Sequence, residues 1–297
     1  MFKDIIPNLV SFDTDLKHLS GCYLSTNFDF YGEIKNKNRF HYKIIINNDF
    51  EIPRIYDFRS AYYYKKDKFW YYQRNIYSLI LKFGFDSKNK IFYVNKLYTF
   101  IPFTMGGVFP PGNLITDLIS LELFLNGITI IKGCSFKIND KIVIILAPSF
   151  NGKTQLINSV LKKGGQYIAE DIIAYDFIQK KLYPTAFSYS LFSHIGRVKH
   201  DRTNRKKDYL RESQTNPEIF FVQNITNNRY KSRKKNLLEI FNFQSLIWMR
   251  NPLGQAYIFE EKLTELIYKQ ILKLSTFKSQ IKFKQINNFD YDSVFNY

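Results

Sequence analysis

The segment Ile142–Thr154 constrains the fold of this chain more than any other part of the sequence. An apolar run, Ile142–Ala147, stops at a turn that ends in Gly152-Lys153-Thr154, and a helical pattern starts directly afterwards. A strand, a phosphate-sized loop, Gly-Lys-Thr and a helix are the parts of a phosphate-binding P-loop. The segment therefore predicts nucleotide binding, and the alternative is an ordinary turn between a strand and a helix.

The chemistry expected of this loop follows from its backbone and its two last residues. Successive backbone N–H groups turn toward one point, and the start of the following helix adds partial positive charge. Lys153 is expected to reach the outer phosphates of ATP, and the Thr154 hydroxyl is expected to ligate Mg²⁺. The predicted nucleotide-binding positions are Ala147, Ser149, Phe150, Asn151, Gly152, Lys153 and Thr154.

Composition bounds the class of protein and its partners. The chain has 297 residues, 45% of them hydrophobic and 18% aromatic, which is enough for one large or two smaller domains with a substantial core. The formal net charge of +17 favours anionic partners, although the abundance of Lys, Asn, Ile, Phe and Tyr also suggests biased codon usage. None of the usual nucleic-acid-binding modules is present, which argues against a nucleic-acid partner.

Cysteine usage and hydropathy predict a cytoplasmic protein without a membrane segment. Cys22 and Cys134 are far apart, so there is neither a disulfide framework nor a metal-binding spacing. The N-terminal residues lack the pattern of a signal peptide. No apolar run approaches the ~20 residues that span a bilayer.

The N-terminal part reads as a β-rich region. Residues 1–38 are mixed and carry little signal, whereas Phe40–Ile46, Trp70–Tyr72, Tyr77–Phe83 and Ile91–Val94 are aromatic or β-branched segments separated by turns. Short strands with short turns predict an antiparallel arrangement. The breaker-rich connection Met105–Gly112 suggests a boundary, which gives a β-rich region over 1–110 and a second domain over 111–297.

The C-terminal part reads as an α/β domain around the loop. A helix is predicted over Leu114–Leu125, a hairpin over Thr129–Leu146 with Asn139-Asp140 as its turn, and a helix that ends at Gly164-Gly165. Further segments are predicted as strands at Ile219–Val222 and Ser279–Ile286, as helices at Leu237–Trp248 and Lys262–Leu274, and as basic, solvated runs at 197–216 and 229–235.

Two neighbouring carboxylates follow the P-loop helix. Tyr167–Ala169 reads as a short strand that delivers Glu170-Asp171, and Ile172–Tyr175 continues extended. In a parallel sheet the end of the short strand lies beside the loop. Phosphoryl transfer needs a carboxylate for the metal and a base for the attacking hydroxyl. Asp171 is therefore a candidate ligand of Mg²⁺, and Glu170 is a candidate base that accepts the proton of the attacking hydroxyl. The alternative is an acidic pair at a strand end without a chemical role.

Four short motifs in this part of the chain resemble the catalytic domain of HPr kinase/phosphorylase and its bacterial serine-kinase-like relatives. They follow one another at matching spacing over residues 131–171. The family's V-H-G, G-x-S-G-x-G-K-[ST], K-R-G and A-D-D correspond to Ile131-Lys132-Gly133, Ala147–Thr154, Lys162-Lys163-Gly164 and Ala169-Glu170-Asp171.

The resemblance implies a P-loop fold related to phosphoenolpyruvate carboxykinase, with ATP and Mg²⁺. It implies that Glu170 is the general base, that Asp171 and Thr154 serve the metal, and that Lys132 and Lys153 act beside the phosphates. Lys132 replaces the family's histidine, and it neutralises phosphate but does not switch its charge near neutral pH as histidine does. Ala147 and Phe150 replace glycines.

Three functions follow from these observations. The first is an ATP–Mg-dependent kinase for a serine- or threonine-type hydroxyl of a peptide or small molecule. An acidic acceptor would fit the basic run Arg197–Lys207, and the alternative for that run is a disordered loop. The second is a pseudokinase that binds nucleotide without turnover, because four positions of the site depart from the family. The third is an adaptor that binds nucleic acid or acidic proteins through the basic runs. The sequence leaves the oligomeric state open.

Overall fold

The computed structural model describes residues 1–17, 19, 22, 24–25, 28–49, 61–66, 69–76, 79–99, 111–147, 153–185, 209–224, 272, 278–286 and 290–295. The chain divides into two compact units, and the division falls within a helix, between Leu118 and Ile119. The predicted boundary between residues 110 and 111 stays a prediction, because residues 100–110 lie outside these ranges. In the described part of the chain the fold is mixed α/β, rich in strands and with few helices.

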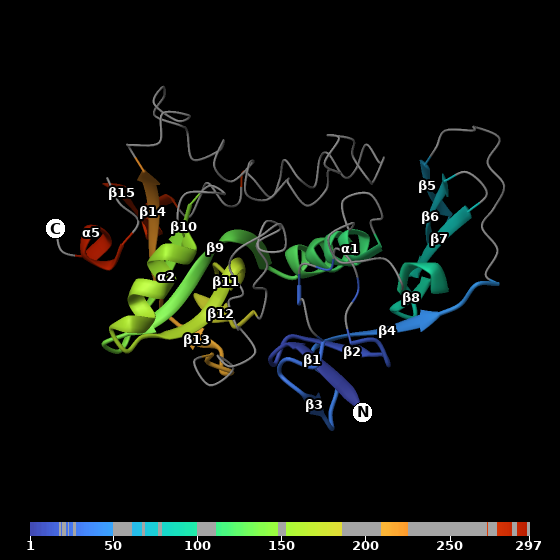
Figure 1. The fold of residues 1–297 in the computed structure, drawn as a ribbon, viewed down its shortest axis with the longest axis horizontal. Coiled ribbons are helices and arrows are strands. Elements are labelled where there is room, and N and C mark those ends of the chain that lie inside the picture. Colours follow the sequence, from blue (N-terminus) through green and yellow to red (C-terminus); the bar gives the residue numbers. More distant parts are fainter. Residues whose placement is uncertain are drawn as a thin grey trace. The chain divides into compact units, whose positions relative to one another are not determined.

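The first unit is built on one eight-stranded sheet with the order β3-β1-β2-β4-β8-β7-β6-β5 (Figure 1). A short 3-10 helix, η1, and the helix α1 follow it along the chain. The elements are β1 (Phe2–Ile6), β2 (Val10–Asp13), β3 (Glu33–Ile34), β4 (Phe40–Ile46), β5 (Ala61–Lys66), β6 (Phe69–Ile76), β7 (Leu79–Asp86), β8 (Ile91–Val94), η1 (Lys96–Thr99) and α1 (Pro111–Leu125).

The prediction of an antiparallel first region is wrong for two pairs of neighbouring strands, both of which involve β4. Most neighbouring strands pair antiparallel, but β4 pairs parallel with both β2 and β8. Residues 47–90 separate β4 from β8 and contain the antiparallel pairs of β5, β6 and β7. This long excursion lets β8 return beside β4 in the same direction, which a short turn does not allow.

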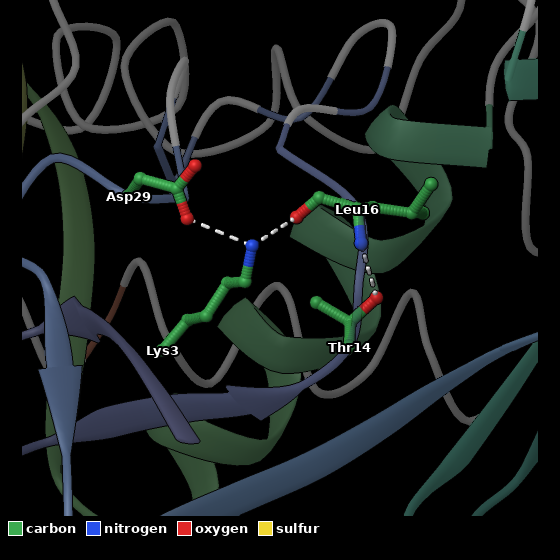
Figure 2. A network of polar contacts seen from close by, with 4 residues as sticks. All are labelled: Lys3, Thr14, Leu16 and Asp29. Atoms are coloured by element: carbon green, nitrogen blue, oxygen red, sulfur yellow. Dashed lines mark hydrogen bonds and ion pairs between the residues drawn. The ribbon is translucent and has the colours of Figure 1, made fainter. Parts of the chain in front are cut away.

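A buried lysine ties the N-terminal strand to the loops that follow it (Figure 2). Lys3 in β1 is 7% exposed, and its Nζ donates to Asp29 Oδ1 at 2.7 Å and to the Leu16 carbonyl at 2.9 Å. The backbone N–H of Leu16 in turn donates to Thr14 Oγ1 at 3.2 Å. The network satisfies an ammonium group that burial would otherwise make costly.

The second unit contains a seven-stranded sheet in its described part, with the order β13-β12-β11-β9-β10-β14-β15 (Figure 1). The remaining elements are two helices and one short 3-10 helix, η6. The bounds are β9 (Ile128–Ile138), β10 (Lys141–Leu146), α2 (Lys153–Lys162), β11 (Gln166–Asp176), β12 (Lys181–Tyr183), β13 (Gln214–Thr215), β14 (Glu218–Asn224), η6 (Lys278–Gln280), β15 (Ile281–Ile286) and α5 (Tyr291–Phe295).

The predicted hairpin and the helix after the loop are confirmed. β9 and β10 pair antiparallel around Asn139 and Asp140, whose φ angles of 48° and 60° suit a two-residue hairpin turn. α2 covers one face of the sheet, where Leu156, Ile157 and Val160 are fully buried. The predicted strands near residues 219 and 281 are also present, as β14 and β15, and they pair parallel to one another.

Several predictions fall outside the described residues. These are the basic runs within 197–208 and 229–235, the helix over Leu237–Trp248 and all of the helix over Lys262–Leu274 except Leu272. Among the helices of the described ranges, none combines the length and the apolar character needed to cross a bilayer. Both cysteines are buried free thiols.

Candidate active site

The structure contains the strand and the helix of the predicted strand-loop-helix unit. β10 ends at Leu146 and α2 begins at Lys153. Ala147 is fully buried in the cluster that includes Leu156 and Ile157 of α2. Ser149, Phe150, Asn151 and Gly152 lie outside the described residues, so their role in holding phosphate stays a prediction.

Lys153 is the cation at the start of the helix. It is the first residue of α2 and is 7% exposed. Its Nζ donates to the carbonyl oxygen of Ala147 at 3.2 Å, six residues back along the chain. The side chain therefore reaches back across the connection to the end of β10.

Strand alternation places the predicted catalytic positions on the face of the sheet that α2 covers. Successive residues of a strand belong to opposite faces. Position 132 lies two residues before Cys134 in β9, and position 170 in β11 pairs with Cys134. Lys132 and Glu170 therefore share a face with the buried cluster around α2, which includes Cys134, Phe136, Ile138, Val143, Ile145, Ala147, Leu156, Ile157 and Val160.

Glu170 is level with the end of β10. It pairs with Cys134, which pairs with Ile145 on its other side, so these residues form one row across β11, β9 and β10. Ile145 is the next-to-last residue of β10. The row therefore lies directly before the connection to Lys153. Because β9 lies between β11 and β10, Glu170 and Ile145 at the two ends of the row are about 10 Å apart.

Two expectations about the acidic pair are corrected by this arrangement. The strand does not end at Glu170-Asp171, because β11 continues to Asp176, and the predicted extended segment Ile172–Tyr175 belongs to the same strand. The strands of the pair and of the loop run in the same direction but are not neighbours, because the hairpin inserts β9 between them. The pair nevertheless keeps its level beside the end of β10, since the register across β9 is fixed.

Asp171 belongs to the opposite face. It pairs with Gly133, and its neighbours two residues away, Ala169 and Ile173, are buried in the cluster on the face away from α2. The role of Asp171 as a magnesium ligand stays a prediction, as does that of Thr154, the second residue of α2. At Lys132, Thr154, Glu170 and Asp171 the structure describes the backbone.

Gly133 explains how the three strands meet so closely at this level. A Cβ atom at this position would lie 2.5 Å from the Ile145 carbonyl oxygen and 2.6 Å from Ile173 Cδ1. Both distances are shorter than carbon tolerates, so any side chain would push β9 away from β10 or β11. The glycine is therefore required for the row that contains Glu170.

One residue of the site has no signal in the sequence. Thr185, two residues beyond β12, is fully buried and lies beside the acidic pair on the edge of β11 away from β9. Its backbone N–H donates to the Ile168 carbonyl at 3.0 Å, and its hydroxyl donates to the Ile172 carbonyl. A threonine after Tyr183-Pro184 matches many local patterns, and only the pairing of distant segments identifies this one.

A magnesium ion would need oxygen ligands from both the chain and the phosphates. Among the described residues, no group of three or more His, Cys, Asp or Glu side chains is placed to hold a metal ion. Magnesium at nucleotide sites is commonly held by one or two protein oxygens together with phosphate oxygens and waters. Thr154 at the start of α2 is a residue type that suits this mode of binding, whereas Glu170 and Asp171 lie on opposite faces of the sheet, so at most one carboxylate of the pair is on the face that α2 covers.

Comparison with known proteins leaves the family open. The sequence matches no protein-family model and no curated protein. Among solved structures, the chain is similar to the HPr(Ser) kinase/phosphatase from Coxiella burnetii, with 12% identity and a TM-score of 0.23. The alignment covers 51% of this chain and 95% of that one. A likeness at this level assigns neither a family nor an activity to the chain.

Proposed function

We propose that the chain is an ATP–Mg-dependent phosphotransferase of the HPr-kinase-like type, with a phosphoenolpyruvate-carboxykinase-like P-loop fold. Its acceptor is a serine- or threonine-type hydroxyl of a peptide or small molecule. The observation that carries the proposal is the placement of Lys153, buried at the start of α2 with its Nζ on the Ala147 carbonyl. Lys132 and Glu170 lie on the same face of the sheet.

The roles of the residues follow from the charge that transfer develops. ATP would supply the phosphoryl group, and Mg²⁺ would neutralise part of the negative charge on its oxygens. Lys153 holds the outer phosphates, and Lys132 neutralises charge on the oxygens of the transferred group. Thr154 and Asp171 provide oxygen ligands for the metal. Glu170 accepts the proton of the acceptor hydroxyl, whose oxygen bonds to phosphorus as ADP leaves.

Binding without turnover is the second candidate, and one observation favours it. Ala147, which stands where a P-loop usually has glycine, is fully buried against α2. A side chain packed at the base of the connection restricts how far the loop can rearrange around a phosphate. A chain that binds ATP–Mg²⁺ but transfers nothing to any acceptor would support this second function.

Removal of the Lys153 cation tests the proposal. Lys153→Ala is expected to weaken ATP–Mg²⁺ binding at least 100-fold in calorimetry, because the cation that contacts the phosphates is lost. Lys162→Ala is the matched control, since it removes the same charge from the exposed end of the same helix. Equal affinity in Lys153→Ala and the wild type would remove the nucleotide site from this loop.

A second variant separates transfer from binding. Glu170→Gln keeps the size of the side chain and removes its ability to take a proton. It is expected to bind ATP–Mg²⁺ like the wild type and to lose ~10²–10⁴-fold in transfer. Transfer is measured as the mass increase of candidate peptides, including those encoded next to this gene, and wild-type rates in Glu170→Gln would exclude this residue as the base.

A further inference from the structure

The edge of β11 that carries Thr185 changes partner along its length. β12 pairs with β11 only over Ala174–Asp176. Beyond Tyr183, the last residue of β12, the chain continues past Pro184, and Thr185 forms a parallel bridge with Ala169. In the described part of the chain, Thr185 is therefore the residue that flanks the acidic pair on this edge.

Thr185 forms hydrogen bonds with the backbone on both sides of the acidic pair. Its N–H donates to the Ile168 carbonyl at 3.0 Å and its Oγ1 donates to the Ile172 carbonyl. The residues between these two carbonyl groups include Glu170 and Asp171. Because Thr185 is 0% exposed, water cannot readily replace either bond.

The two hydrogen bonds require a bend in β11. Carbonyl groups four residues apart in a straight strand are about 13 Å apart, farther than the amide and hydroxyl of one threonine reach. A register shift between Tyr167 and Ala169, where β11 pairs with β9, supplies a local irregularity of the kind that bends strands. Thr185 therefore lies inside a curve of β11 at the level of Glu170.

We propose that Thr185 is a positioning residue for Glu170, and that its hydroxyl fixes the curve of the β11 backbone on which Glu170 lies. The inference rests on the proposed function. A general base must lie within hydrogen-bond reach of the proton it takes, and a misplacement of ~1 Å can cost on the order of 100-fold in rate. Lys153 lies at the start of α2 with its Nζ on Ala147 at the end of β10, so we expect replacement of Thr185 to leave ATP affinity unchanged.

The test is Thr185→Val, which keeps the shape of the side chain and removes its donor. Phosphoryl transfer to a serine peptide, with ATP and Mg²⁺ in the full chain, is expected to fall ~10- to 100-fold in kcat, with the KM for ATP unchanged. Thr185→Ser, which keeps the hydroxyl, is expected to restore most of the rate. Thr129→Val is the matched control, because Thr129 is a buried threonine of β9 that pairs with Tyr175, away from the acidic pair.

A double variant separates positioning from general loss of structure. In a Glu170→Gln background, Thr185→Val is expected to cause no further loss, since the group that it positions is already absent. A full additional loss, an equal loss of ATP affinity, or wild-type transfer by Thr185→Val would each overturn the inference. If Thr185→Val does not fold, Thr185→Ser alone carries the test. A wild-type kcat in Thr185→Ser supports the role of the hydroxyl, and a fall of both kcat and ATP affinity in Thr185→Ser contradicts it.

The two proposals fail in different ways. Failure of the proposed function appears in the wild-type chain, as ATP–Mg²⁺ binding without transfer or as no binding at all, and the inference then falls with it. Failure of the inference alone appears as an active wild type whose Thr185→Val variant is equally active.

Discussion

Each of the two units contains a buried lysine, and the two lysines are held in different ways. Lys3 and Lys153 are both 7% exposed. The Nζ of Lys3 contacts a carboxylate, Asp29, and a carbonyl contributed by a loop 13 residues away (Figure 2). The Nζ of Lys153 donates to the carbonyl of Ala147, at the other end of the connection that the lysine itself terminates.

The two lysines differ in what their hydrogen bonds join. An ion pair with a protein carboxylate satisfies the charge of Lys3 within the fold, and it joins segments that are distant in sequence. The carbonyl bond of Lys153 is local, and it joins the two ends of the connection between β10 and α2, where the proposed function places the phosphates. Replacement of Lys3 should therefore reduce stability, and replacement of Lys153 should reduce ligand binding.

The largest effect expected from this comparison is a loss of stability at Lys3. Lys3→Met keeps the apolar stem and removes the ammonium group, so the Leu16 carbonyl and Asp29 lose a donor. We expect the free energy of unfolding to fall by about 1.5–3 kcal/mol, the range for hydrogen bonds to charged groups, with ATP affinity unchanged. Urea denaturation and calorimetry measure the two quantities.

The matched control is Lys43→Met in the same sheet. Lys43 lies 4.0 Å from Asp13, and its side chain is 53% exposed, so its ion pair contributes little. Two outcomes would contradict the expected difference between Lys3 and Lys153. One is that Lys3→Met weakens ATP binding as much as Lys153→Ala does, and the other is that Lys3→Met has the same unfolding free energy as Lys43→Met.

The sequence predicts those parts of the site that depend on local patterns. The run that ends at Leu146, the turn residues Asn139-Asp140 and the helical spacing after Lys153 each act over a few residues, and the structure has all three elements. The level of Glu170 beside the loop also follows from spacing, because the hairpin and the helix have fixed lengths.

The parts that local patterns miss depend on which distant segments pair. An apolar strand does not specify its neighbour, so the insertion of β9 between β10 and β11 and the parallel pairing of β4 are set by the packing of the whole sheet. Residues 1–38 carry weak periodicity, yet β1, β2 and β3 form there because they pair with one another or with β4. Thr185 is missed for the same reason.

A buried carboxyl in α1 provides a second test of how burial acts in the first unit. Asp117 is fully buried, and neither of its carboxylate oxygens has a hydrogen-bond partner among the described residues. Burial raises the pKa of this carboxyl well above its usual range. Lys3 is buried with a carboxylate partner, whereas Asp117 has no donor among the residues that the structure describes. Replacement of Lys3 should therefore lower the stability of the fold, and replacement of Asp117 by a neutral residue should raise it where the carboxyl would ionise.

The pH dependence follows from the sign of that shift. A raised pKa means that the folded chain binds more protons than the unfolded chain, so stability is present at low pH and falls as pH rises toward the folded-state pKa. Asp117→Asn removes the titration, and we expect its advantage over the wild type to grow by about 1.4 kcal/mol per pH unit in that window. Parallel curves of unfolding free energy against pH for the two proteins would contradict this expectation.

The smallest effect is expected at the other end of the helix that Lys153 begins. Lys163 follows α2 directly, and its Nζ lies 2.6 Å from Asp292 Oδ1 and 4.3 Å from the centre of the Tyr291 ring. The lysine and aspartate side chains are 43% and 63% exposed, so water screens the pair and Lys163→Ala should cost at most about 1 kcal/mol. Lys163 has an acidic partner, as Lys3 does, but in solvent. An equal loss of unfolding free energy in Lys163→Ala and Lys3→Met would contradict the idea that burial strengthens the network around Lys3. Lys3 and Lys153 would then differ only in the groups that their Nζ atoms contact.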